Sequence, residues 1–205
     1  MTSLTPMTSL IDRRALLLGL GATAVLFPAP LLAMTQAQAR ELIGQVMGEV
    51  QGAIAGGRSE AQVIRDFERI FDRHGDVPII ARSVLGPPAR SASAQELRAF
   101  TEAFRGYLAR KYGRQFRRFS GARAEVTGAR QVQRHWEVVS VMHMRGEAPF
   151  EVRWHVSDQS GQRRFFNLII EGVNLLAAER QEIGTMLERR GGSIARLTED
   201  LRRAG

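Results

Sequence analysis

The chain has 205 residues, enough for one domain of ordinary size together with a targeting segment. Its hydrophobic content of 44% and charged content of 24% are typical of a globular protein and argue against disorder. The absence of cysteine excludes disulfides, thiolate metal sites and a cysteine nucleophile.

The beginning of the chain has the features of an export signal. Arg13 and Arg14 precede an apolar run over residues 15–27, which is shorter than the roughly 20 residues that a membrane span needs. The paired arginines resemble a twin-arginine signal, although Asp12 stands where that signal has Ser. We therefore expect the protein to be exported.

Two cleavage sites fit this signal. Residues 37–39, Ala-Gln-Ala, supply the small-x-small pattern of a signal-peptidase site. A cut after Ala33 is the alternative, because Pro28 and Pro30 already end the apolar run. We take residues 1–39 as the signal peptide and residues 40–205 as the mature domain.

The first half of the mature domain is predicted to be helical. Ser59 followed by Gln62, and Ser93 followed by Glu96, are capping boxes that start two of the helices. Apolar residues recur at spacings of three and four in four segments, residues 42–54, 63–71, 79–85 and 97–119.

From Gly121 the hydrophobic period changes to two. In the last strand, Phe166, Leu168 and Ile170 are predicted on one face, and Phe165 and Ile169 on the other, so this strand should lie between layers. Short connections make the sheet antiparallel, with strands at residues 122–127, 136–144, 150–156 and 165–170.

Two helical segments close the chain, at residues 176–187 and 194–201, the second capped by Ser193. Helices, then strands, then helices, without βαβ alternation, predict an α+β fold. We expect helices packed against one twisted antiparallel sheet of about four strands, with a cystatin-like or nuclear-transport-factor-like shape.

The sequence contains no familiar catalytic or metal motif: HExxH, GxSxG, the Walker loop and GxGxxG are all absent. His143 and His155 could meet across neighbouring strands, but ordinary surface or hydrogen-bonded imidazoles explain them better, and we predict no metal site. Glu171 would need a partner to act as a general acid; otherwise it accepts hydrogen bonds from backbone amides at the turn. We predict no catalytic residue.

The net charge of +8 is carried almost wholly by arginine, because Lys111 is the only lysine. Such a charge favours anionic partners, and a genome rich in arginine codons would produce it equally. The arginines are dispersed and are not interleaved with exposed aromatics, so we do not expect nucleic-acid binding.

The apolar faces of the last strand and of the preceding helices are abundant for one small sheet, and we interpret them as the lining of a lipid pocket between sheet and helices. Each candidate could also be an ordinary core residue. The candidate lipid-binding residues are Ile80, Val84, Leu85, Phe104, Leu108, Val139, Val141, Val152, Trp154, Phe166, Leu168 and Ile170.

Four stretches carry a family resemblance, residues 67–72, 80–86, 92–95 and 171–174, together with the apolar stripe of Phe100, Phe104, Leu108 and Tyr112. Taken in order from about Arg40 onward, they resemble the MlaC family, also called the toluene-tolerance family of periplasmic ABC-transport auxiliary proteins. The chain departs from the family pattern at residues 87–90, where an aromatic is missing, and at Asn174, where the family most often has Ser.

The resemblance implies a soluble, monomeric periplasmic carrier that holds a phospholipid by its acyl chains and needs no cofactor besides this cargo. Its partners would be an inner-membrane MCE-domain protein of an ABC transporter and an outer-membrane lipoprotein–porin complex, and its role the maintenance of outer-membrane lipid asymmetry. The alternatives are a carrier of another apolar lipid such as a hopanoid, an exported enzyme that uses Glu171, and a basic adaptor without a cavity.

Overall fold

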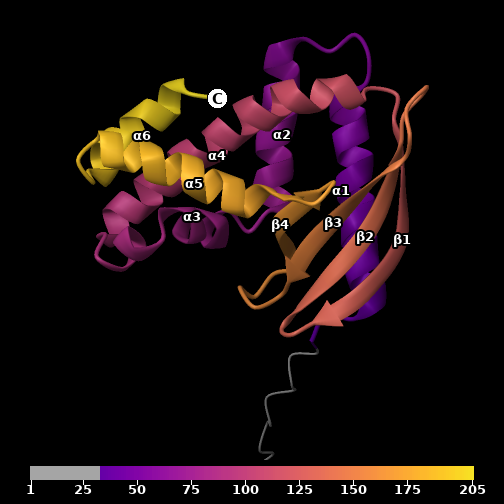
Figure 1. Ribbon diagram of the computed structural model, residues 1–205, viewed down its shortest axis with the longest axis horizontal. Coiled ribbons are helices and arrows are strands. Elements are labelled where there is room, and N and C mark those ends of the chain that lie inside the picture. Colours follow the sequence, from indigo (N-terminus) through magenta and orange to yellow (C-terminus); the bar gives the residue numbers. More distant parts are fainter. Residues whose placement is uncertain (1–32) are drawn as a thin grey trace, which may run out of the picture. The chain divides into compact units, whose positions relative to one another are not determined.

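A computed structural model describes residues 33–205 (Figure 1). Most of the predicted signal peptide, residues 1–32, lies outside the described residues. The helices of the described part are α1 (Gln36–Ile54), α2 (Glu60–His74), α3 (Val77–Leu85), α4 (Ala94–Phe116), α5 (Leu175–Arg189) and α6 (Ile194–Arg203), with short 3-10 turns at η1 (Pro87–Arg90) and η2 (Arg117–Phe119).

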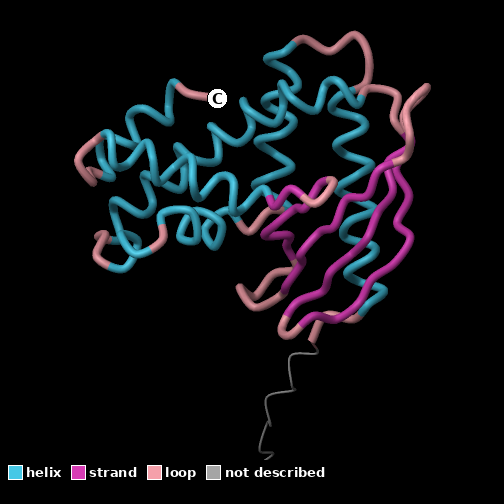
Figure 2. The backbone as a smooth tube through the Cα atoms, in the orientation of Figure 1, coloured by secondary structure: helices cyan, strands magenta, loops and turns pink. Residues whose placement is uncertain are grey.

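The strands form one antiparallel sheet in which each strand pairs with the next along the chain (Figure 2). They are β1 (Arg123–Val132), β2 (His135–His143), β3 (Phe150–Ser157), β4 (Arg164–Ile170) and β5 (Val173–Asn174). The α+β prediction is confirmed. The sheet has one strand more than the four expected, because two residues after Gly172 return to pair with the end of β4.

A bulge in β4 changes the predicted alternation of its side chains. Trp154 of β3 pairs with Leu168, but Val156 pairs with Phe165, so Phe166 is an extra residue in the register. Phe165, rather than Phe166, therefore shares the face of Leu168 and Ile170. The prediction that Phe166 alternates regularly with those residues was wrong because a bulge interrupts the period of two.

Helix starts follow local side-chain chemistry. Both predicted capping boxes, Ser59 with Gln62 and Ser93 with Glu96, are confirmed, and Ser193 caps α6 as expected. Helix α1 has a capping box of its own at Thr35 and begins at Gln36, earlier than the apolar periodicity indicated.

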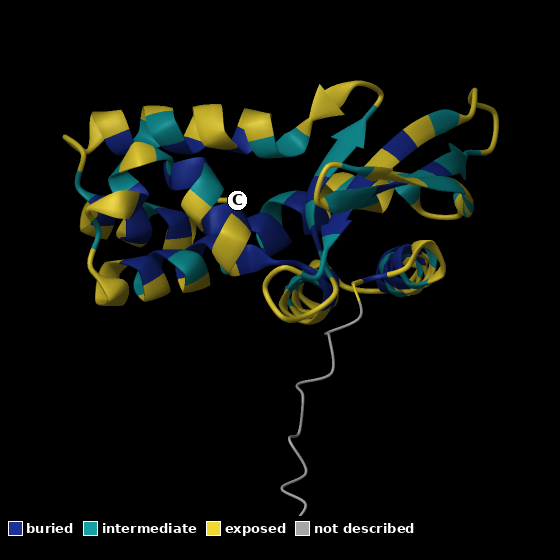
Figure 3. Ribbon diagram, turned by 90° about the horizontal axis from the view of Figure 1, so that it is seen from below, coloured by how far each residue is buried: buried dark blue, intermediate teal, exposed yellow. Residues whose placement is uncertain are grey.

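One face of the sheet, called the inner face here, packs against helices. Helix α1 lies against β1 and β2, and α2 lies beside α1 and reaches β4. Helix α5 packs against β4 and α3, while α4 packs between α2 and α6. Figure 3 shows the buried residues gathered between these elements and the exposed ones turned outward. The alternating residues of the strands face the other way, on the outer face.

Candidate lipid pocket

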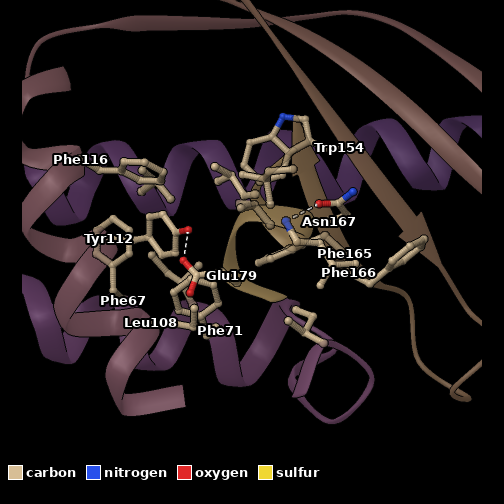
Figure 4. Close-up of a pocket in the computed structure, with 17 residues that line it drawn as sticks. Phe67, Phe71, Leu108, Tyr112, Phe116, Trp154, Phe165, Phe166, Asn167 and Glu179 are labelled. Carbon is tan, nitrogen blue, oxygen red and sulfur yellow. Dashed lines mark hydrogen bonds between the residues drawn. The ribbon is translucent and has the colours of Figure 1, made fainter. Parts of the chain in front are cut away.

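An apolar pocket with about 60 Å³ of free space, the first cavity, lies between the inner face of the sheet and five helices (Figure 4). Helices α1 to α5 supply one side of its wall, and β3 and β4 supply the other. Its lining consists of Val46, Val50, Phe67, Ile70, Phe71, Ile80, Leu108, Tyr112, Phe116, Trp154, Phe165, Phe166, Asn167, Leu168, Leu175, Leu176 and Glu179.

A second cavity, also with about 60 Å³ of free space, adjoins the first, because Val50, Phe116, Trp154 and Leu168 belong to both walls. It extends along the inner face toward β1 and β2. Its further lining residues are Met47, Gln51, Ile54, Phe119, Ala124, Met142, Phe150, Val152 and Ile170. Together the two cavities provide a continuous apolar wall that spans the inner face.

The polar groups of these walls are mostly bonded to other protein groups. The indole N–H of Trp154 donates to Ser140 Oγ at 3.0 Å, and the amide of Gln51 donates to the carbonyl of Ala122 at 3.0 Å. The side-chain oxygen of Asn167 accepts the backbone N–H of Leu176 at 3.1 Å, at the start of α5. Because these groups are satisfied within the protein, the cavities present mainly carbon to a ligand.

Glu179 is the charged residue in the lining, with 3% of its surface exposed. Its Oε1 accepts hydrogen bonds from the hydroxyl of Tyr112 at 2.6 Å and from Lys111 Nζ at 2.7 Å (Figure 4 shows the Tyr112 bond). Its Oε2 is buried without a partner among the described residues. Lys111 also pairs with Glu182 at 2.6 Å, so the cluster fastens α5 to α4 beside the first cavity.

The charges of this cluster shift its pKa values. Burial and the negative charge of Glu179 raise the pKa of Tyr112 far above its ordinary value. Burial alone would lower the pKa of Lys111, but hydrogen bonds to Glu179 and Glu182 outweigh it and raise that pKa. The cluster is therefore a neutral phenol and an ammonium that share a buried carboxylate.

Seven of the twelve candidate lipid-binding residues line the cavities: Ile80, Leu108, Val152, Trp154, Phe166, Leu168 and Ile170. Val84, Leu85 and Phe104 are buried in the helical core away from both linings. Val139 and Val141 alternate with the inner-face residues Val138 and Ser140, which places them on the outer face.

The lining also includes residues that were not among the candidates. Val46 and Val50 come from α1, and Leu175, Leu176 and Glu179 come from α5. Helical periodicity marks such apolar residues as buried but does not separate a packed core from a cavity wall. Glu179 was recognisable in principle, because it lies three residues after Leu176 and four before Ile183 on an apolar stripe.

The residues considered for catalysis or metal binding lie apart from the cavities. Glu171 is exposed in the turn after β4 and belongs to neither lining. His155 lies opposite Glu137 in the sheet, whereas His143 pairs at the far end of β2 with Arg123. Residues 33–205 contain no group of three or more His, Asp or Glu side chains suited to hold a metal ion. Within the same residues, no helix is both long enough and apolar enough to cross a bilayer.

This chain is similar to known proteins in both its sequence and its fold. Residues 41–203 match the model of the family described as MlaC protein. The fold is similar to that of a phospholipid-binding protein from Ralstonia solanacearum, solved in complex with a phospholipid, with a TM-score of 0.68 and 17% sequence identity. The similarity covers 80% of this chain and 95% of the Ralstonia chain.

Proposed function

Since the chain belongs to the MlaC family, we propose that it is a periplasmic carrier that binds a phospholipid by its acyl chains and is not an enzyme. It exchanges this cargo with two membrane partners, an inner-membrane ABC transporter with an MCE-domain subunit and an outer-membrane lipoprotein–porin complex. This exchange maintains the lipid asymmetry of the outer membrane.

The two adjoining apolar cavities on the inner face carry the proposal. Each has about 60 Å³ of free space, so the walls must move apart for an acyl chain to enter. Their carbon-lined walls suit acyl chains, and the shared wall at Trp154 and Leu168 would lie between two chains of one lipid. The Ralstonia protein of the same fold was solved with a phospholipid bound, which supports the same cargo class here.

The apolar lining of the cavities also predicts how the cargo leaves. Each buried methylene contributes about 0.8 kcal/mol, so an acyl chain of ~15 methylenes contributes on the order of 10 kcal/mol before costs. Spontaneous escape into water is therefore slow. A membrane partner that opens the pocket, or offers a continuous apolar path, provides the route out.

Lipid extraction tests the proposed cargo. Protein purified from a bacterial periplasm without detergent should release a phospholipid into organic solvent, identified by mass spectrometry at near one equivalent per chain. Recovery of a hopanoid would change the proposed identity of the cargo but would still support the carrier role. Recovery of no lipid from folded protein would contradict the carrier role itself.

A matched pair of substitutions tests the site. Leu168→Glu places a carboxylate in the wall shared by both cavities and should abolish lipid retention, because burying a charge in an apolar wall is costly. Val139→Glu makes the same change at a half-buried position on the outer face and should retain lipid. Circular dichroism establishes that both variants fold. A folded Leu168→Glu protein with a full complement of lipid would contradict the assigned wall.

A further inference from the structure

The segment immediately before the expected domain boundary is part of the folded core. Met34 has 6% of its surface exposed and packs in the hydrophobic cluster. Its backbone nitrogen lies 2.6 Å from Asp158 Oδ2, in the hairpin turn between β3 and β4. Its carbonyl accepts the indole N–H of Trp136 at 2.9 Å, from β2. Three contacts of different kinds therefore hold Met34 in place.

The next five residues build the start of α1. Thr35 and Gln38 form a reciprocal capping box, in which each side chain accepts the other's backbone N–H. The Gln36 side chain donates to the carbonyl of Ala129 in β1 at 2.7 Å. Ala39 is completely buried. A chain that begins at Arg40 would lack this cap, this sheet contact and two buried side chains, Met34 and Ala39.

We propose that export processing cuts the Ala33–Met34 peptide bond, and that the mature protein begins at Met34. This inference rests on the export that is part of the proposed function. Hydrolysis adds one water, which leaves a carboxylate on Ala33 and an α-amino group on Met34. Ala33 supplies the small residue that a signal peptidase requires before the cut. The alternative cut after Ala39 better fits the small-x-small pattern but removes residues that the fold uses.

The cut also gives Asp158 a new role. The free α-amino group of a mature N-terminus has an ordinary pKa of about 8 and is mainly protonated at pH 7. In place of a neutral peptide N–H, Asp158 then faces an ammonium group at the same 2.6 Å position. The mature N-terminus is thereby held by an ion pair to the β3–β4 turn, which a chain extended before Met34 or begun at Arg40 would lack.

The test is the N-terminus of the exported protein. The full 205-residue chain is expressed in a Gram-negative host, and the periplasmic fraction is examined by N-terminal sequencing and intact mass. The expected sequence is Met-Thr-Gln-Ala. A start of Arg-Glu-Leu-Ile overturns this inference alone, whereas a chain that stays uncleaved overturns both this inference and the proposed export. Lipid extraction from the same sample reports separately on the carrier role.

Two exposed alanines provide a matched control. Ala33→Leu enlarges the residue directly before the proposed cut and should greatly reduce the mature product. Ala37→Leu makes the same change three residues before the alternative cut and should leave processing unchanged, because its side chain is exposed on α1. The reverse pattern, with processing lost only in Ala37→Leu, would overturn the assignment.

Discussion

At the scale of single residues, Glu179 has the least ordinary environment in the pocket. It places a carboxylate among apolar side chains, and its neighbours Tyr112 and Lys111 come from a different helix. Removing one partner of a buried ion pair strongly destabilises a protein, because the remaining charge is then buried without a partner. We therefore interpret Glu179 as the group that fixes α5 on α4 where both border the first cavity.

The two tyrosines of the chain, Tyr107 and Tyr112, report on this cluster. Burial, followed by the charge of Glu179, raises the pKa of each above the ordinary value of 10.0. A phenol whose pKa is raised in the folded state stabilises the fold below pH 10, and that stability is lost as the pH rises above 10 toward the folded-state pKa. Ultraviolet titration should therefore show little tyrosinate near pH 10 until the protein unfolds.

Glu179→Gln should lower the pKa of both phenols and weaken this alkaline dependence, because the raising charge is removed. Glu188→Gln, at an exposed position on the same helix, is the matched control and should leave the titration unchanged. Folded wild-type protein whose tyrosines titrate near pH 10 would contradict the described cluster.

At the scale of elements, the β4–β5 turn determines the course of α5. Glu171 and Gly172 have φ angles of 49° and 82°, which reverse the chain so that Val173 pairs with Ile170. Asn174 then caps α5 through a bond from the N–H of Ala177. This short segment directs the α5 residues of the first cavity over the end of the sheet.

Two glycine substitutions separate backbone strain in the turn from helix propensity in α5. Gly172→Ala should destabilise the protein by about 1–2 kcal/mol, because its left-handed backbone conformation is unfavourable for a residue with a Cβ. Gly184→Ala, inside α5, should stabilise it by up to about 1 kcal/mol, because alanine favours helix. No atom lies within 4 Å of the added Cβ at either site. Urea unfolding measures both, and a shift of the same sign would contradict the turn geometry.

At the scale of the whole molecule, the cavities link cargo to stability. Helices and sheet meet around two adjoining apolar cavities, each with about 60 Å³ of space that side chains leave unfilled. A ligand that binds only the folded state stabilises it by mass action. Under the proposed function, acyl chains in these cavities add to the core of a protein that has no disulfides.

Delipidation should therefore lower the Tm by roughly 5–10 °C, as expected for loss of a ligand present at about 100 times its Kd. Differential scanning calorimetry before extraction, after extraction and after reloading with phospholipid measures the change. The Leu168→Glu variant serves as the control, since its Tm should not respond to added lipid. Equal Tm values for extracted and reloaded wild-type protein would count against a cargo within these cavities.

Local chemistry in the sequence determined much of this structure. Serine and threonine caps, turn glycines and apolar spacing depend on residues within a few positions of each other, and so the helices and the first four strands were predictable. The segment from Thr35 to Gln38 carries the same capping signature, and α1 begins there.

Tertiary structure alone decided where the apolar surfaces meet. The bulge at Phe166 depends on how β4 pairs with β3, and the outer-face position of Val139 depends on which side of β2 the helices cover. Hydrophobic periodicity shows that a side chain avoids water. The same periodicity occurs in a tightly packed core and in a cavity wall, so it does not separate the two. The cavity depends on how side chains from segments far apart in the sequence fill the space between them. No single stretch of sequence therefore predicts it.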